Sequence, residues 1–228
     1  MAQLALSTAL VMIATMMINV YVPATKGYFN LGETMIYFTA LTMGAGIAAF
    51  AGGVGSALAD IILGYGIYAP ATLVIKALEG AAAGFLVEKV RRRMGAKFLL
   101  PVSSVVVAGY FAALLAIGST LFAGELEFTL GSVTLKGFLH PFSWIPLAVA
   151  AVATPIYLMV RARQAEGLLI LVLLASGLIM VAGYFIYEQA ILGFYALAEV
   201  PVNLGQVILG VAVAIPLYRA VNRIMGGG

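Results

Sequence analysis

Long uninterrupted apolar runs dominate this chain, and they constrain its fold more than any other feature. Hydrophobic residues make up 64% of the 228 residues, whereas charged residues make up 9%. A water-soluble domain of this length cannot bury that much apolar surface, so most of it must face lipid or neighbouring membrane helices. The runs are continuous and do not alternate, which excludes a membrane β-barrel pattern. The sequence therefore predicts an all-α, multi-pass protein of the plasma membrane.

A length of about 20 residues per membrane crossing predicts eight spans. They fall at about 3–21, 33–50, 53–67, 71–90, 99–122, 141–160, 166–188 and 200–218. Between the fifth and sixth runs, residues 125–136 alternate apolar and polar side chains around Gly131-Ser132, which predicts a β-hairpin outside the membrane. We expect residues 1–228 to form a single transmembrane domain.

Basic residues are distributed unevenly between the connections. Nine of them fall on one side of the predicted bundle: Lys89, Arg91, Arg92, Arg93, Lys97, Arg161, Arg163, Arg219 and Arg223. The connections on the other side hold only Lys26 and Lys136. Because cytoplasmic loops are enriched in Lys and Arg, both termini are predicted to be cytoplasmic. The net charge of +3 thus reflects the orientation of the chain in the membrane. It does not indicate binding of nucleic acid, and we expect no nucleic-acid partner.

Chemistry-bearing residues are scarce. The chain has no cysteine and one histidine, so we expect no metal site and no thiol chemistry. We find no Ser/His/Asp set and no phosphate-binding loop, and we therefore expect no enzymatic activity, no catalytic residue and no cofactor.

Polar residues within the spans are the candidates for function, because charge inside a membrane is costly. Asp60 and Lys76 lie at similar depth on either side of a tight turn, which predicts an ion pair, either as a brace between helices or with one partner also contacting substrate. The polar residues near the outer side predict a pocket for a small amphipathic molecule. Tyrosines at span ends are also compatible with an interfacial aromatic belt. The predicted binding residues are Tyr28, Asn30, Lys76, Glu79, Tyr184, Glu188, Asn203 and Gln206.

Small residues are concentrated between Gly44 and Ala59 and again between Gly80 and Gly84. Such residues let helix backbones approach closely. They predict tight packing within the bundle, with docking of a partner as the alternative.

Several stretches together resemble the S components of energy-coupling factor (ECF) transporters, the substrate-capture subunits for vitamins. They are Gly27–Glu33, Gly52–Asp60, Gly64–Gly80, Gly183–Glu188 and Val200–Gln206. The resemblance covers about residues 1–95 and 166–224. The family has six helices, which implies an S-component core at 1–98 and 164–228 and an inserted helix-hairpin-helix at 99–163.

The resemblance implies a function as well. An S component binds a water-soluble vitamin or precursor from outside and works with an ECF transmembrane scaffold subunit and two cytoplasmic ATPases. Stretches such as Gly27–Glu33 look most like the branch for riboflavin-like or pyrimidine-like cargo. Ala5 and Ala9 match the spacing of the family's scaffold-docking surface. The alternatives are an ion-coupled secondary transporter that needs no ATPase partners, and a structural membrane protein. Internal repeats, which the transporter alternative requires, are not evident.

Overall fold

The computed structural model describes residues 1–22, 27–92, 124–130, 133–143 and 164–226, together with isolated residues of 105–116 and 145–157. Within these residues six α-helices form the bundle: α1 (Ala2–Met17), α2 (Gly32–Met43), α3 (Ala45–Leu63), α4 (Ala69–Arg91), α7 (Gln164–Leu192) and α8 (Glu199–Ile224). α3, α4 and the segment Glu166–Ile224, which contains α7 and α8, are long and apolar enough to cross a membrane. The chain is therefore a membrane helix bundle. The predicted spans 99–122 and 141–160 lie largely outside the described residues.

The second and third spans are divided at a different place from the one predicted. The expected boundary lay at about residues 50–53, but the helices separate at Gly44, which has φ 82°. This left-handed φ favours glycine and ends α2, whereas Gly52 and Gly53 lie within α3 against α4. With 12 residues, α2 is about 18 Å long, too short to cross a membrane. It instead packs against α1, α3, α4 and α8.

The small residues pack helices against one another, as the sequence predicted. A Cβ atom at Gly80 would lie 2.3 Å from the Ala48 carbonyl oxygen, and one at Gly84 would lie 2.4 Å from the Ala45 backbone. At Gly53 it would lie 2.6 Å from the Leu73 carbonyl oxygen. Hence α3 and α4 approach so closely that no larger side chain fits between their backbones.

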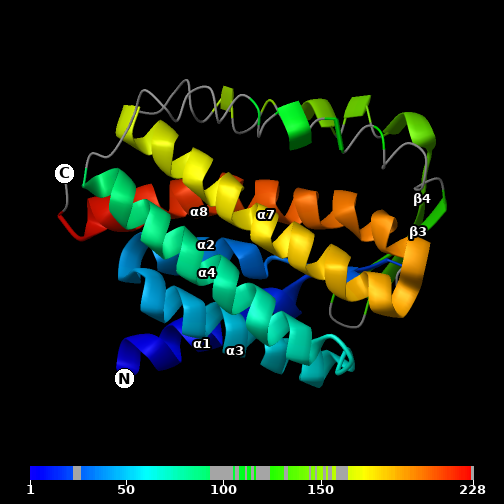
Figure 1. Ribbon diagram of the computed structural model, residues 1–228, viewed down its shortest axis with the longest axis horizontal. Coiled ribbons are helices and arrows are strands. Elements are labelled where there is room, and N and C mark those ends of the chain that lie inside the picture. Colours follow the sequence, from blue (N-terminus) through cyan, green and yellow to red (C-terminus); the bar gives the residue numbers. More distant parts are fainter. Residues whose placement is uncertain are drawn as a thin grey trace.

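A four-stranded sheet closes one end of the bundle. The predicted hairpin is present as β3 (Gly124–Leu130) and β4 (Val133–Leu139). Its partner was not expected: β3 pairs antiparallel with β1 (Asn19–Val22), part of which lies in the predicted first span. β1 also pairs with β2 (Gly27–Phe29), so the strand order is β2-β1-β3-β4. The sheet lies at one end, and both chain termini lie at the other (Figure 1).

Residues of the segment 99–163 pack against α7. The Tyr110 hydroxyl donates a 2.8 Å hydrogen bond to the Leu174 carbonyl, and Tyr110 and Ala148 belong to the hydrophobic core. All residues from Leu169 to Leu174 are buried, so this part of α7 is covered on every side. The assignment of 99–163 as an insertion between 1–98 and 164–228 remains a proposal.

We expect Tyr110→Phe to lower the free energy of unfolding by about 1 kcal/mol, because it removes one buried hydrogen bond. Thermal unfolding of the purified protein in detergent measures the loss. Tyr195→Phe is the matched control, since Tyr195 is exposed. Equal stability of both variants would contradict a supporting contact between this segment and α7.

Candidate functional site

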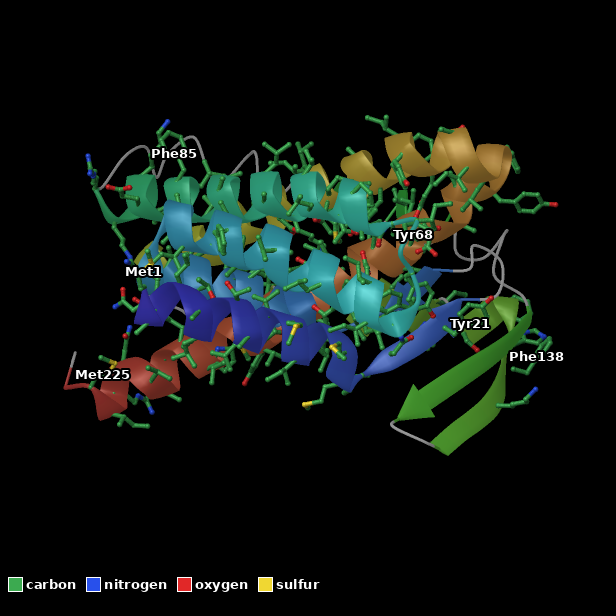
Figure 2. All side chains as sticks on the ribbon, turned by 90° about the horizontal axis from the view of Figure 1, so that it is seen from below. Met1, Tyr21, Tyr68, Phe85, Phe138 and Met225 are labelled. Carbon is green, nitrogen blue, oxygen red and sulfur yellow. The ribbon has the colours of Figure 1, made fainter. Side chains whose placement is uncertain are left out.

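A cavity lies at the end of the bundle that carries the sheet. It encloses about 470 Å³, including the space at its open mouth. One of its lining residues, Tyr68, lies near the sheet, whereas Met1 and Met225 lie at the opposite end (Figure 2). The lining residues come from α1, β2, α3, α4, α7 and α8 and the short connections beside them. They are Thr15, Tyr28, Asn30, Ser56, Asp60, Tyr68, Thr72, Lys76, Tyr184, Glu188, Glu199, Asn203 and Gln206.

The structure brings the predicted binding residues together, with one exception. Tyr28, Asn30, Lys76, Tyr184, Glu188, Asn203 and Gln206 all line the cavity. Glu79 does not, because it is fully buried behind Lys76, where its Oε1 accepts a 2.7 Å hydrogen bond from the Tyr37 hydroxyl. These side chains come from positions as far apart in the sequence as 28 and 206, and yet they face a common space.

Other lining residues were not among the predicted ones: Thr15, Ser56, Tyr68, Thr72 and Glu199. The spacing of residues along the helices could have predicted two of them. Ser56 lies four residues before Asp60, and Thr72 lies four residues before Lys76, so each shares a helix face with a charged residue. The structure joins the Thr72 hydroxyl to the Tyr184 hydroxyl at 2.8 Å, which links α4 to α7 across the cavity wall.

Lys76 is paired with residues other than the one predicted. The expected ion pair with Asp60 is wrong: the salt bridges of Lys76 join its Nζ to Glu33 Oε1 and, at 3.3 Å, to Glu79 Oε2. All three side chains are at least 95% buried. Glu33 lies in the first turn of α2, where the helix dipole favours a negative charge. Because α2 is short and packs against α4, it brings Glu33 to Lys76, a contact that depth along neighbouring spans could not reveal.

Asp60 instead holds the β2 strand in place. The Asp60 Oδ1 atom accepts a 2.6 Å hydrogen bond from the Tyr28 hydroxyl. The ring centroids of Tyr28 and Tyr65 are 4.4 Å apart. Burial raises the pKa of the Tyr28 phenol, and the neighbouring Asp60 carboxylate raises it further. The phenol therefore stays protonated and donates to Asp60 at neutral pH.

Amide groups connect the loop before α2 to α8. The Gln206 Oε1 atom accepts a 2.9 Å hydrogen bond from the backbone N–H of Asn30. The Gln206 Nε2 atom donates to Asn203 Oδ1 at 3.0 Å, as expected for residues three apart on one helix face. Gln206 thus positions the cavity wall as well as lining it.

Among the residues that the structure describes, two carboxylate oxygens of the cavity lining have no hydrogen-bond partner: Asp60 Oδ2 and Glu188 Oε2. Asp60 is 4% exposed and Glu188 is 2% exposed. Tyr68 lies close enough to Glu188 and Glu199 for these acids to add to the rise in its pKa that burial causes. Buried acceptors without partners are costly, so the cavity is complementary to a molecule that offers hydrogen-bond donors.

The predicted docking residues Ala5 and Ala9 lie away from the buried face of α1. That face consists of Ser7, Val11 and Thr15, at intervals of four residues. Ala5 is exposed and Ala9 is partly exposed. Their part in docking a scaffold subunit stays a prediction.

Comparison with known proteins identifies the family. The family profile described as "ECF-type riboflavin transporter, S component" matches residues 1–156. The chain belongs to this S-component family. The chain is accordingly a multi-pass plasma membrane protein. The match extends through residues 99–156, beyond the N-terminal stretch in which the resemblance was stated.

One curated relative comes from Pyrococcus woesei and is described as an uncharacterized protein in the gap 3' region. It is 48% identical over 75 residues, which is 33% of this S component and 50% of that protein. The chain thus spans about half the length of this relative.

Proposed function

We propose that this S component captures a water-soluble, riboflavin-like vitamin from outside the cell and delivers it to an ATP-driven ECF importer. The observation that carries the proposal is the convergence of polar side chains from distant parts of the chain on one cavity. The matching family profile is named for riboflavin, which supports a flavin over the pyrimidine-like alternative. A ring system with polar edges matches a wall of tyrosines, amides and carboxylates.

The proposed orientation places the cavity outside and both termini in the cytoplasm. Arg91 lies at the C-terminal end of α4, where it donates to the Leu41 carbonyl and to the Tyr218 hydroxyl at 3.0 Å. Arg219 pairs with Glu166 at 2.9 Å, and α8 ends close to Arg223. The chain termini and Met225 lie at the end opposite to the sheet (Figures 1 and 2). This clustering of cations agrees with the positive-inside rule.

In this proposal the chain itself performs no catalysis. A transmembrane scaffold subunit and two cytoplasmic ATPases would supply the energy, and the exposed Ala5 and Ala9 side of α1 would meet the scaffold. Small residues on an exposed helix face allow the close approach of a partner helix in lipid.

We expect Asn203→Ala and Gln206→Ala each to weaken riboflavin binding by about 1–3 kcal/mol, because each removes hydrogen-bonding groups from the cavity wall. Gln206→Ala should have the larger effect, since it also releases the backbone of Asn30. Quenching of flavin fluorescence by the purified protein measures both affinities. Asn222→Ala is the control, because Asn222 lies near the C-terminal end of α8, away from the cavity lining. Unchanged affinity in both cavity variants would exclude this site.

A buried titratable cluster supports a second candidate, the ion-coupled secondary transporter. Lys76, Glu33 and Glu79 form a contiguous group of ionisable side chains within the bundle. Uptake of labelled riboflavin in cells with and without an ECF ATPase module separates the two functions. Uptake that persists without the ATPases and stops when the proton gradient is dissipated would favour the second candidate and exclude the first.

A further inference from the structure

The position of Asp60 does not stabilise the helix that carries it. Asp60 lies three residues before Leu63, where α3 ends, and the helix dipole disfavours a carboxylate in the last turn. The residue is 4% exposed, and an unpaired charge buried within a membrane bundle is costly. A contact with another molecule accounts for an acid at this place better than the folding of α3 does.

The two oxygens of the Asp60 carboxylate have different surroundings. Oδ1 accepts the 2.6 Å hydrogen bond from the Tyr28 hydroxyl of β2. Oδ2 is buried and has no hydrogen-bond partner among the residues that the structure describes. The Thr72 hydroxyl also faces Asp60, but it is joined to the Tyr184 hydroxyl at 2.8 Å and completes no hydrogen bond to Oδ2. The protein therefore holds one oxygen and leaves the other to a molecule in the cavity that Asp60 lines.

Lys76 does not neutralise Asp60, although it is the basic side chain among the described lining residues. Its Nζ is in ion-pair contact with Glu33 and lies 3.3 Å from Glu79 Oε2. Both of these acids are buried behind the cavity and do not line it. A hydrogen-bond donor on the ligand would supply the missing partner of Asp60 Oδ2, and a hydrogen bond to an ionised acceptor is stronger than a neutral one.

A second carboxylate acceptor lies on the same lining. Glu188 is 2% exposed, and its Oε2 likewise has no hydrogen-bond partner within the described part of the chain. Gln206, in contrast, already uses its Oε1 and its Nε2 within the cavity wall. A ligand chain that bears several hydroxyl groups can donate to both carboxylates. In riboflavin the ribityl chain carries such hydroxyls, whereas the ring offers mainly acceptors.

Resting on the proposed function, we propose that Asp60 binds the polyol chain of the vitamin by accepting a ligand hydroxyl at Oδ2, and that Tyr28 is the positioning residue for this contact. The Tyr28 hydroxyl holds Oδ1 and thereby fixes the direction in which Oδ2 points. Asp60 then determines specificity, because a flavin that carries the hydroxyl chain is preferred over the same ring without it.

The test compares riboflavin with lumiflavin, which has the same ring and a methyl group in place of the ribityl chain. Quenching of flavin fluorescence by the full-length protein in detergent at neutral pH gives the two dissociation constants, and their ratio is the ribityl preference. We expect the wild-type protein to bind riboflavin at least about 100-fold more tightly, because two charge-assisted hydrogen bonds are gained. Lumiflavin that binds within about threefold of riboflavin would overturn the inference and leave flavin capture intact.

Asp60→Asn tests the acceptor directly. Asparagine keeps the shape of the side chain and an oxygen for Tyr28, but it replaces the charged acceptor Oδ2 with an amide NH2 group. The ribityl preference should fall by about tenfold or more through weaker binding of riboflavin, with lumiflavin affinity unchanged. Glu88→Gln is the matched control, since Glu88 is exposed on α4, pairs with Arg92 and does not line the cavity. It should leave the preference as it is. Equal weakening of both flavins by Asp60→Asn would indicate a structural role for Asp60 and overturn the inference.

Tyr28→Phe tests the positioning role and keeps the inference open to test if Asp60→Asn does not fold. The substitution removes the hydroxyl that holds Oδ1 and retains the ring, so the ribityl preference should narrow by about threefold to tenfold. The same substitution in the Asp60→Asn background should narrow it less, because the two side chains act through one contact. A preference that Tyr28→Phe leaves unchanged would overturn the positioning role. Absence of binding of either flavin to the folded wild-type protein would overturn flavin capture and this inference with it.

Discussion

Replacing Lys76 with methionine should destabilise this S component by about 3–5 kcal/mol, the cost of removing one partner of a buried ion pair. The substitution leaves Glu33 and Glu79 as two buried carboxylates without their cation. They must then either bear uncompensated charge or take up protons, and both outcomes cost free energy. Unfolding of the purified protein in detergent, followed by circular dichroism, measures the loss.

Lys89→Met is the matched control, because Lys89 lies on the same helix and is exposed. It should change stability by less than about 0.5 kcal/mol. The double variant Glu33→Gln with Lys76→Met should be more stable than Lys76→Met alone, since one of the orphaned charges is removed. A Lys76→Met protein as stable as Lys89→Met would contradict the buried ion cluster.

Gly80→Ala should destabilise the bundle by about 3 kcal/mol, although alanine is the better helix former. The added Cβ would lie 2.3 Å from the Ala48 carbonyl oxygen and 3.0 Å from the Ala49 nitrogen. These are backbone atoms of α3 and cannot rotate away, so the two helices must separate. The same unfolding measurement reports the effect.

Gly46→Ala provides the control for this substitution. Gly46 lies within α3, the helix that Gly80 of α4 contacts, and a Cβ atom there would meet nothing within 4 Å. We expect this variant to be unchanged or up to about 1 kcal/mol more stable, because alanine lowers the conformational entropy of the unfolded chain. If both variants behaved alike, the α3–α4 contact would not be as close as the structure has it.

The helices could be predicted from the sequence to the extent that hydrophobic runs determine them. α4 and α8 begin and end within a few residues of the predicted spans, apart from a longer C-terminal end of α8. The division at Gly44 was not foreseen, because a single left-handed glycine among many helical glycines leaves no distinct sequence signal. The pairing of β1 with β3 was also missed, since strand pairing between residues more than 100 positions apart depends on the tertiary fold.

The identities of the site residues were largely predictable, and their contacts were not. Polar side chains within apolar runs are rare and costly, so Lys76, Asn203 and Gln206 stood out from the sequence alone. Depth along a span predicted Asp60 as the partner of Lys76. In the structure its partners are Glu79, three residues later on the same helix, and Glu33, which the packing of α2 against α4 brings to it. Tyr68 and Thr72 passed unnoticed, because a tyrosine at a span end and a threonine in a helix are common without any binding role.

The sequence by itself determined that this protein resides in a membrane and which side chains are too costly there to be incidental. This follows from the free energy of transfer into lipid, which is a sum over residues and needs no knowledge of their neighbours. Only the tertiary structure decided that Glu33 pairs with Lys76 and that one cavity collects the remaining polar groups. Those outcomes depend on how short α2 packs among four other helices, and such contacts are set by distance and rotation between segments far apart in the chain.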